Sequence, residues 1–292
     1  MLRFRLLLLP LALGCADTRA AALDLRMEAS TAWAENIARS SAPADWRDAM
    51  RHQVQASASL LRQWTDGLVT TGSIDAGFER LPQFTRNDAA RVGLGFTARQ
   101  KFGWGAYAPL LAFDAGLRHR EAQIDGDDGW TASGALRASR RLTSAWRLAA
   151  TGDWQQHYAR SPVWDTRHHR LFGTLTWDVN DRLQLSHGQG RLWGQFTANA
   201  SPRIWALATT GALGANVSEY YRTVPRAVTH SYGPDWVSYR VAGHVSFWWL
   251  ELAPALGRDT SLPLRYESLF SFNRAGVKYR QDIWTLQWLH RF

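Results

Sequence analysis

Apolar and polar residues alternate along most of this chain, from Leu23 to Phe292. A period of two is typical of β-strands whose two faces meet different surroundings, and no long segment shows the period of an amphipathic helix. Clusters of Gly, Asp, Asn and Pro separate the alternating segments, as turns do, so the pattern predicts about twelve strands. They cover residues 23–34, 50–64, 68–80, 88–101, 107–121, 129–141, 146–158, 166–178, 182–193, 237–252, 259–270 and 279–292.

The predicted connections alternate in length. Short connections at 65–67, 102–106, 142–145, 179–181 and 253–258 alternate with longer polar ones at 35–49, 81–87, 122–128, 159–165, 194–236 and 271–278. Transmembrane barrels have short periplasmic turns, longer external loops and an even number of strands. Residues 23–292 are therefore predicted to form one all-β, up-and-down antiparallel transmembrane barrel with a long external loop at 194–236. Barrels of about 10 or 14 strands are the alternatives.

The two faces of a predicted strand differ in chemistry. In 88–101, Val92, Leu94 and Phe96 lie on one face, while Arg91 and Arg99 lie on the other. Barrel strands turn their apolar face to lipid and their polar face to the lumen. No segment after residue 22 approaches the roughly 18 apolar residues of a spanning helix. A closed barrel, which pairs its backbone groups internally, is the remaining way to cross a bilayer.

The tryptophan content strengthens this interpretation, because 16 Trp residues are many for a chain of 292. An indole ring has an apolar body and one N–H that prefers a polar partner, so Trp collects at membrane interfaces. The predicted belt near the short turns includes Trp249, and the belt near the long loops includes Trp33, Trp130, Trp164, Trp193 and Trp236. The residues chosen as membrane-interface positions are Trp64, Trp104, Trp146, Trp177, Trp248, Trp288 and Phe292.

Residues 1–22 have the pattern of a cleaved export signal. Arg3 and Arg5 precede an apolar run, and small residues follow up to Ala22, where cleavage fits best. The alternative is a lipoprotein signal in which Cys15 is acylated. Cleavage after Ala22 would remove the single cysteine and with it any disulfide or thiolate metal site.

The last predicted strand carries aromatic or apolar residues at every second position, among them Trp284, Leu286 and Trp288, and it stops at Phe292. It resembles the C-terminal targeting strand of bacterial outer-membrane β-barrel proteins, although His290 departs from that pattern. The resemblance implies an outer-membrane location and contact with the barrel assembly machinery. It reaches a superfamily that contains acidic-sugar porins, nucleoside channels, lipid hydrolases and autotransporter pores, so it does not choose a function.

The charge on the predicted inward face is mostly basic. Acidic inward positions are fewer, and a surplus of fixed cations in a narrow aqueous pore favours anions. Such a lumen is similar to the arginine-lined lumen of small acidic-oligosaccharide porins. Arg26 and Arg182 are further inward candidates. The residues chosen as pore-lining are Arg91, Arg99, Lys101, Arg118, Arg120, Arg137, Arg141, Arg147, Arg170, Arg240 and Arg265.

Three functions remain open at this point. The first is a narrow, anion-preferring channel for small acidic solutes; the second is a non-conducting structural or surface-interaction barrel. The third is an outer-membrane lipid hydrolase, but the resemblance to the phospholipase would require a Ser two residues after a His, and Gln189 stands there after His187. Ser186 and His187 also face apart on one strand.

No catalytic residue, metal site or cofactor is therefore expected, and the chain is expected not to be an enzyme. Lipid and lipopolysaccharide are the expected contacts of the outer surface, in part because a net charge of +9 suits their phosphates. Nucleic acid is not expected as a partner, and the barrel is expected to be a monomer.

Overall fold

The computed structural model describes residues 22–212 and 214–292 of the chain. The predicted export signal, with Cys15 in it, lies outside the described residues except for Ala22, which begins the first strand. None of the helices in the described ranges is long and apolar enough to span a membrane.

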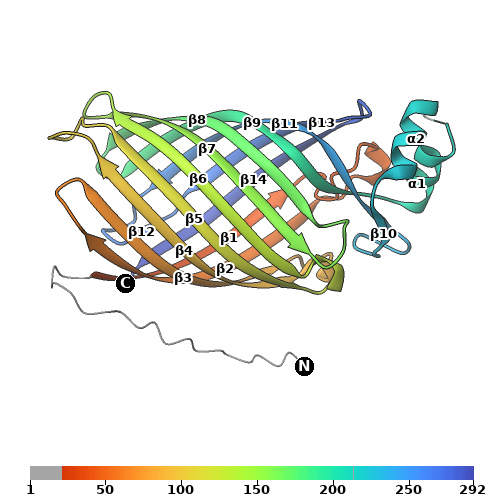
Figure 1. Ribbon diagram of the computed structural model, residues 1–292, viewed down its shortest axis with the longest axis horizontal. Coiled ribbons are helices and arrows are strands. Elements are labelled where there is room, and N and C mark those ends of the chain that lie inside the picture. Colours follow the sequence, from red (N-terminus) through yellow and green to blue (C-terminus); the bar gives the residue numbers. More distant parts are fainter. Residues whose placement is uncertain (1–21, 213) are drawn as a thin grey trace.

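Twelve antiparallel strands form one closed barrel, which confirms the predicted fold (Figure 1). The barrel strands are β1 (Ala22–Ala34), β2 (Ala49–Gln63), β3 (Leu68–Arg80), β4 (Ala89–Lys101), β5 (Leu110–Ala122), β6 (Gly129–Arg141), β7 (Trp146–Ala159), β8 (Thr166–Asn180), β9 (Leu183–Ala200), β11 (Val237–Pro254), β13 (Leu264–Asn273) and β14 (Lys278–Arg291). The ladder from Arg26 with Arg291 to Ala34 with Ile283 joins β1 to β14. Closure leaves no strand edge unpaired in the barrel wall, as a bilayer requires.

Most strand boundaries agree with the sequence prediction to within two residues, and the larger differences lie at β5, β9 and β13. β5 begins at Leu110 rather than 107, directly after Pro109, which has no N–H to give to a ladder. Pro263 likewise separates β13 from the two-residue strand β12 (Thr260–Ser261). β9 continues to Ala200 instead of ending at 193, because the alternation of residues persists beyond Gly194.

The alternation of faces is visible in the exposure of the side chains. On β4, Val92, Leu94 and Phe96 are 56, 57 and 46% exposed in the isolated chain, whereas Gly93 between them is buried. Leu136 on β6 and Leu171 on β8 are also more than half exposed, at 52 and 58%. These outward positions form the apolar surface that a bilayer covers.

The two ends of the barrel differ, as Figure 1 shows. We call the end that carries the connections at 64–67, 102–109, 142–145, 181–182 and 255–259 the short-turn end, and the opposite end the long-loop end. The longest connection, 201–236, contains α1 (Pro202–Thr209), α2 (Ala215–Thr223) and the short strand β10 (Arg226–Val228). Both helices pack on the part of β9 and β11 that extends beyond the barrel, around Phe196, Tyr239 and Val241.

Candidate functional site

The lumen is the part of the barrel where charged side chains gather, and the strand register tells which side chains share it. Residues that pair across antiparallel strands face the same side. One inward row runs Arg99, Ala112, Arg137, Thr151, Phe172, Gly190 and Phe247 through neighbouring strands from β4 to β11. A strand separation of about 4.8 Å spaces the members of this row.

Several of the predicted pore-lining arginines form ion pairs across the lumen face. Arg170 binds Asp153 at 2.8 Å, and Arg118 lies 3.4 Å from Asp75. The other pairs are Arg120 with Asp127 at 2.9 Å and Arg265 with Glu267 at 3.0 Å. Each of these pairs lowers the net positive charge that the sequence assigns to its part of the wall.

A second group of inward cations is less neutralised. Arg91 hydrogen-bonds the neutral amide of Gln55 at 2.6 Å. Arg99, Lys101 and Arg137 have no carboxylate within ion-pair distance in residues 22–212 and 214–292. Their charge is therefore available to a solute in the lumen.

These free cations lie close to one another near the short-turn end. Arg141 and Arg147 there share one carboxylate, Asp178, at 3.1 and 3.8 Å. We call the group Arg99, Lys101, Arg137, Arg141 and Arg147 the basic wall. The next acidic residue along β5, Asp114, accepts a hydrogen bond from Thr97 at 2.7 Å. The five cations of the basic wall thus share one ion-paired carboxylate, Asp178, and the carboxylate of Asp114 lies at the inner edge of the wall.

Arg240 departs from its predicted place in the pore. It lies in the extension of β11 beyond the barrel, and its guanidinium donates to the carbonyl of Asp165 in the connection 160–165. It pairs with Thr197 on β9, which bonds the same connection through the carbonyl of Val163. It therefore fastens a loop at the long-loop end, whereas the other predicted pore residues lie on inward strand positions.

Three large rings face the lumen beside the basic wall. Phe172 on β8 lies 6.2 Å from Phe247 and 5.5 Å from Trp249 on β11, between ring centroids. We call these three rings the lumen aromatic cluster. Phe247 and Trp249 are only 6 and 7% exposed. Trp249 was expected in the membrane belt beside Trp248, and that prediction is wrong because adjacent residues on a strand face opposite sides.

Two glycines on β9, the strand between β8 and β11, make room for the rings. A Cβ at residue 188 would collide with the indole of Trp249, and one at residue 190 would collide with the backbone and Cβ of Phe172. The sequence signal for this site was the pair Gly188 and Gly190 at inward positions of a strand. Glycine in a strand interior marks the close approach of another group.

We expect Gly188→Ala to destabilise the barrel by about 1 to 3 kcal/mol, because the added methyl forces Trp249 out of its place. The control is Gly173→Ala on the neighbouring strand, where the nearest atom to an added Cβ is 3.9 Å away. The stability of both variants is measured by thermal unfolding in detergent, with the change in gel mobility of the barrel on heating as the readout. Equal stability of the two variants would show that Trp249 does not pack on Gly188.

The connection 35–48, here called the lid loop, folds across the long-loop end. Asn36 and Ala38 are fully buried, at 0% exposure. Asn199 on β9 binds the carbonyl of Ala38 twice, through its backbone N–H and its side-chain amide, each at 3.1 Å. The amide of Asn36 donates to the carbonyls of Ser40 and Arg280 at 2.9 and 3.0 Å. The lid loop is thus held to both β9 and β14.

Residues of the connection 229–236 hold the lid loop from above. The phenol of Tyr232 donates to the carbonyl of Ile37 at 3.2 Å. Its ring lies between Phe84 and Trp236, with centroid distances of 4.9 and 5.6 Å. This burial raises the pKa of Tyr232 to about 12, so the phenol keeps its proton, and can donate this hydrogen bond, up to a higher pH than an exposed tyrosine does.

Cavities occupy the lumen beneath the lid loop. One of about 230 Å³ lies under it, between residues that include Arg51, Glu79 and Asn199. A second, of about 320 Å³, lies farther in and is lined on the lumen side by Asp75, Arg118 and other polar residues. The third, of about 590 Å³, lies at the short-turn end beside Arg141 and Asp178. Polar cavities therefore occur beneath the lid loop, in the middle of the lumen and at the mouth by the short turns.

The predicted membrane-interface residues lie on the outside, at or near the short-turn end. Trp146 and Trp177 stack at 5.4 Å, and Trp248 meets Tyr266 edge to face at 5.3 Å. The exposed fractions of Trp64, Trp104 and Phe292 are 48, 90 and 73%. Trp288 stacks on His290 at 5.5 Å.

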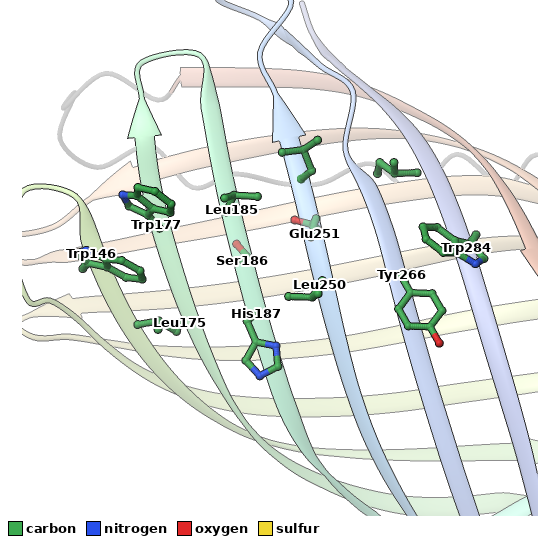
Figure 2. Close-up of a pocket in the computed structure, with 12 residues that line it drawn as sticks. Trp146, Leu175, Trp177, Leu185, Ser186, His187, Leu250, Glu251, Tyr266 and Trp284 are labelled. Atoms are coloured by element: carbon green, nitrogen blue, oxygen red, sulfur yellow. The ribbon is translucent and has the colours of Figure 1, made fainter.

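A groove of about 470 Å³ crosses this outer surface, as Figure 2 shows. It runs between Trp146 and Trp177 on one side and Tyr266 and Trp284 on the other. Leu250, on its floor, has the outward parity of the lipid face. The groove therefore belongs to the lipid-covered surface, whereas the lumen cavities lie inside the barrel.

Trp236 and Trp164 do not join the outer belt that the sequence predicts. Trp236 is 4% exposed, and the guanidinium of Arg47 lies 4.9 Å from its ring centroid. Trp164 lines the cavity beneath the lid loop. Both rings serve the packing of the connections over the barrel mouth.

The nearest approach to a hydrolase site is a row of three polar side chains. His157 contacts the hydroxyl of Thr131 at 2.9 Å, and its other ring nitrogen lies 3.4 Å from the carboxylate of Asp127. Neither Thr131 nor His157 lines any of the cavities described above. Ser186 and His187 do not meet: Ser186 lies 3.4 Å from the hydroxyl of Thr176, and His187 contacts the carbonyl of Trp249 at 3.0 Å.

Comparison with known proteins places the fold. The structure is similar to an outer membrane channel from Pseudomonas putida F1, with a TM-score of 0.56 and 10% identity over 96% of this chain and 100% of that one. The NanC porin matches with a TM-score of 0.44 and 7% identity over 90% and 98% of the two chains, and the KdgM porin with 0.40 and 8% over 90% and 99%. No family model and no curated protein matches the sequence. The predicted resemblance to outer-membrane β-barrels is confirmed at the level of the fold.

Proposed function

We propose that this protein is a narrow outer-membrane channel that prefers anions and admits small acidic solutes. The observation that carries the proposal is the basic wall, in which Arg99, Lys101 and Arg137 face the lumen without an ion-pair partner in the described ranges. Fixed cations in a confined aqueous space raise the local anion concentration and repel cations.

The geometry also favours a narrow path rather than an open pore. The lid loop covers the long-loop end, and the rings of the lumen aromatic cluster fill part of the interior. A twelve-stranded barrel lies between small barrels filled by side chains and wide porins. A solute must therefore pass close to the basic wall, where a charged group acts most strongly.

In this proposal the apolar band lies in the outer membrane, with the short turns in the periplasm. Lipid and lipopolysaccharide cover the outward face, including the groove beside Trp177. The barrel assembly machinery inserts the chain, which works as a monomer; closure of the wall within one chain supports this, because no second copy is needed to complete the barrel. A signal peptide ending near Ala22 provides export.

The extensive bonding of the lid loop supports one competing function, a closed barrel that conducts nothing. Purified protein in liposomes separates the two functions by osmotic swelling. We expect lactate to enter faster than glycerol, a neutral molecule of similar size, and much faster than ethanolamine, a small cation. Protein-free liposomes give the background rate, because small solutes such as glycerol also cross lipid. No swelling above this background with any of the three would support the closed barrel, and equal rates above it for all three would contradict the proposed anion preference.

A further inference from the structure

The basic wall and the lumen aromatic cluster meet on one surface of the lumen. Arg137, Thr151 and Phe172 are successive members of one inward row on β6, β7 and β8. Two strand spacings separate Arg137 from Phe172, or about 10 Å between their Cα atoms. A free guanidinium and an aromatic ring are thus within reach of one small molecule.

The cluster is not merely apolar filling at the edge of the barrel. Its rings are joined by close contacts, and Phe247 and Trp249 stack at 5.9 Å with an interplanar angle of 16°. Two cations already lie on its faces: Arg170 is 5.0 Å from the centroid of Phe172, and Arg265 is 4.6 Å from that of Trp249. Ring faces that attract cations also suit the edge of another aromatic ring.

From this juxtaposition we infer that the channel selects small monocarboxylates that carry an aromatic or alicyclic ring, in preference to polyhydroxylated sugar acids. The carboxylate binds Arg137 through charge-assisted hydrogen bonds, and the ring contacts the exposed part of Phe172, which the buried rings of Phe247 and Trp249 hold in place. The inference rests on the proposed anion channel and adds the chemical class of its solute.

Two physical effects produce the preference. A guanidinium binds a carboxylate through two parallel hydrogen bonds in a fixed geometry. With its carboxylate on Arg137, the solute can therefore extend along the inward row toward Phe172. The hydroxyl groups of a sugar acid form hydrogen bonds with water. Against the aromatic cluster they would lose these bonds, and the rings of Phe172 and Trp249 provide no hydrogen-bonding groups to replace them. An apolar ring loses no such bonds and gains contact with the cluster.

The test uses the full protein in a planar bilayer, with chloride current as the readout. Benzoate and cyclohexanecarboxylate are expected to reduce the current at concentrations about tenfold lower than gluconate or glucuronate do, a difference worth about 1.4 kcal/mol. Trp249→Ala is expected to remove most of this difference while chloride selectivity stays. Trp248→Ala, which changes the adjacent outward ring, is the matched control and leaves the difference intact.

The outcomes separate the two proposals. An anion-selective channel that benzoate and gluconate block equally would overturn the inference and leave the proposed function standing. A silent or cation-selective channel would overturn the proposed function itself. If Trp249→Ala does not fold, the comparison of solutes on the unmodified protein still decides, and Phe172→Leu provides a milder variant of the same cluster.

Discussion

The Arg99→Glu/Arg137→Glu double variant is expected to prefer cations to anions. Both residues lie on one inward row, and no ion pair in the described ranges neutralises either of them. The two changes replace two positive charges by two negative ones, which lowers the charge of the basic wall by about four. The reversal potential under a salt gradient measures the change, and we expect its sign to reverse.

A matched control exists three residues from Arg137. Arg140 lies on the outward face of β6, where it is exposed and its Nε donates to the carbonyl of Tyr107 at 3.3 Å. Arg140→Glu makes the same change in net charge as Arg137→Glu but outside the lumen. If Arg140→Glu shifts the reversal potential as far as Arg137→Glu does, the effect comes from net charge, and the basic wall does not set selectivity.

Removal of the lid loop is expected to raise the single-channel conductance about two- to threefold, because the loop covers the long-loop end of the lumen. The variant replaces residues 37–46 with a short Gly-Ser linker, which removes the contact of Ala38 with Asn199 and that of Ile37 with Tyr232. The barrel wall keeps its strand pairs. Conductance in a planar bilayer is the measurement.

The control for the lid loop is the same linker in place of residues 103–107, an exposed connection at the short-turn end. We expect it to leave conductance unchanged. A change in gel mobility on heating serves as the check that both variants are folded. An unchanged conductance in the lid-loop variant would place the narrowest point deeper in the lumen, at the aromatic cluster.

The strands and their faces could be predicted because the bilayer imposes one rule on all of them. On β4, the apolar residues Val92, Leu94 and Phe96 alternate with inward residues such as Arg91, because lipid lies on one side of the wall and the lumen on the other. Each strand carries this information in its own residues. A connection such as 201–236, with its two helices, carries no such rule, and its structure depends on contacts with distant segments.

The lumen site could be predicted only in part, for reasons that particular residues show. The inward position of Arg137 follows from alternation alone, but its lack of a carboxylate depends on the register of β6 against β5 and β7. The sequence prediction placed Trp249 in the membrane belt because tryptophan favours that position. Its place directly after Trp248 on one strand, which puts the two rings on opposite faces, predicts the lumen instead. Nothing local in Asn36 or Asn199 indicates that they bind the lid loop together, since they are far apart in the chain.

The central claim is that the basic wall makes this barrel an anion-preferring channel, and one measurement tests it most directly. Unmodified protein is inserted in a planar bilayer between two concentrations of potassium chloride, and the reversal potential of single channels is read. We expect single-channel current steps and a reversal potential whose sign shows that chloride carries more of the current. A potential of the opposite sign, or a bilayer that stays silent although folded protein is inserted, would contradict the claim.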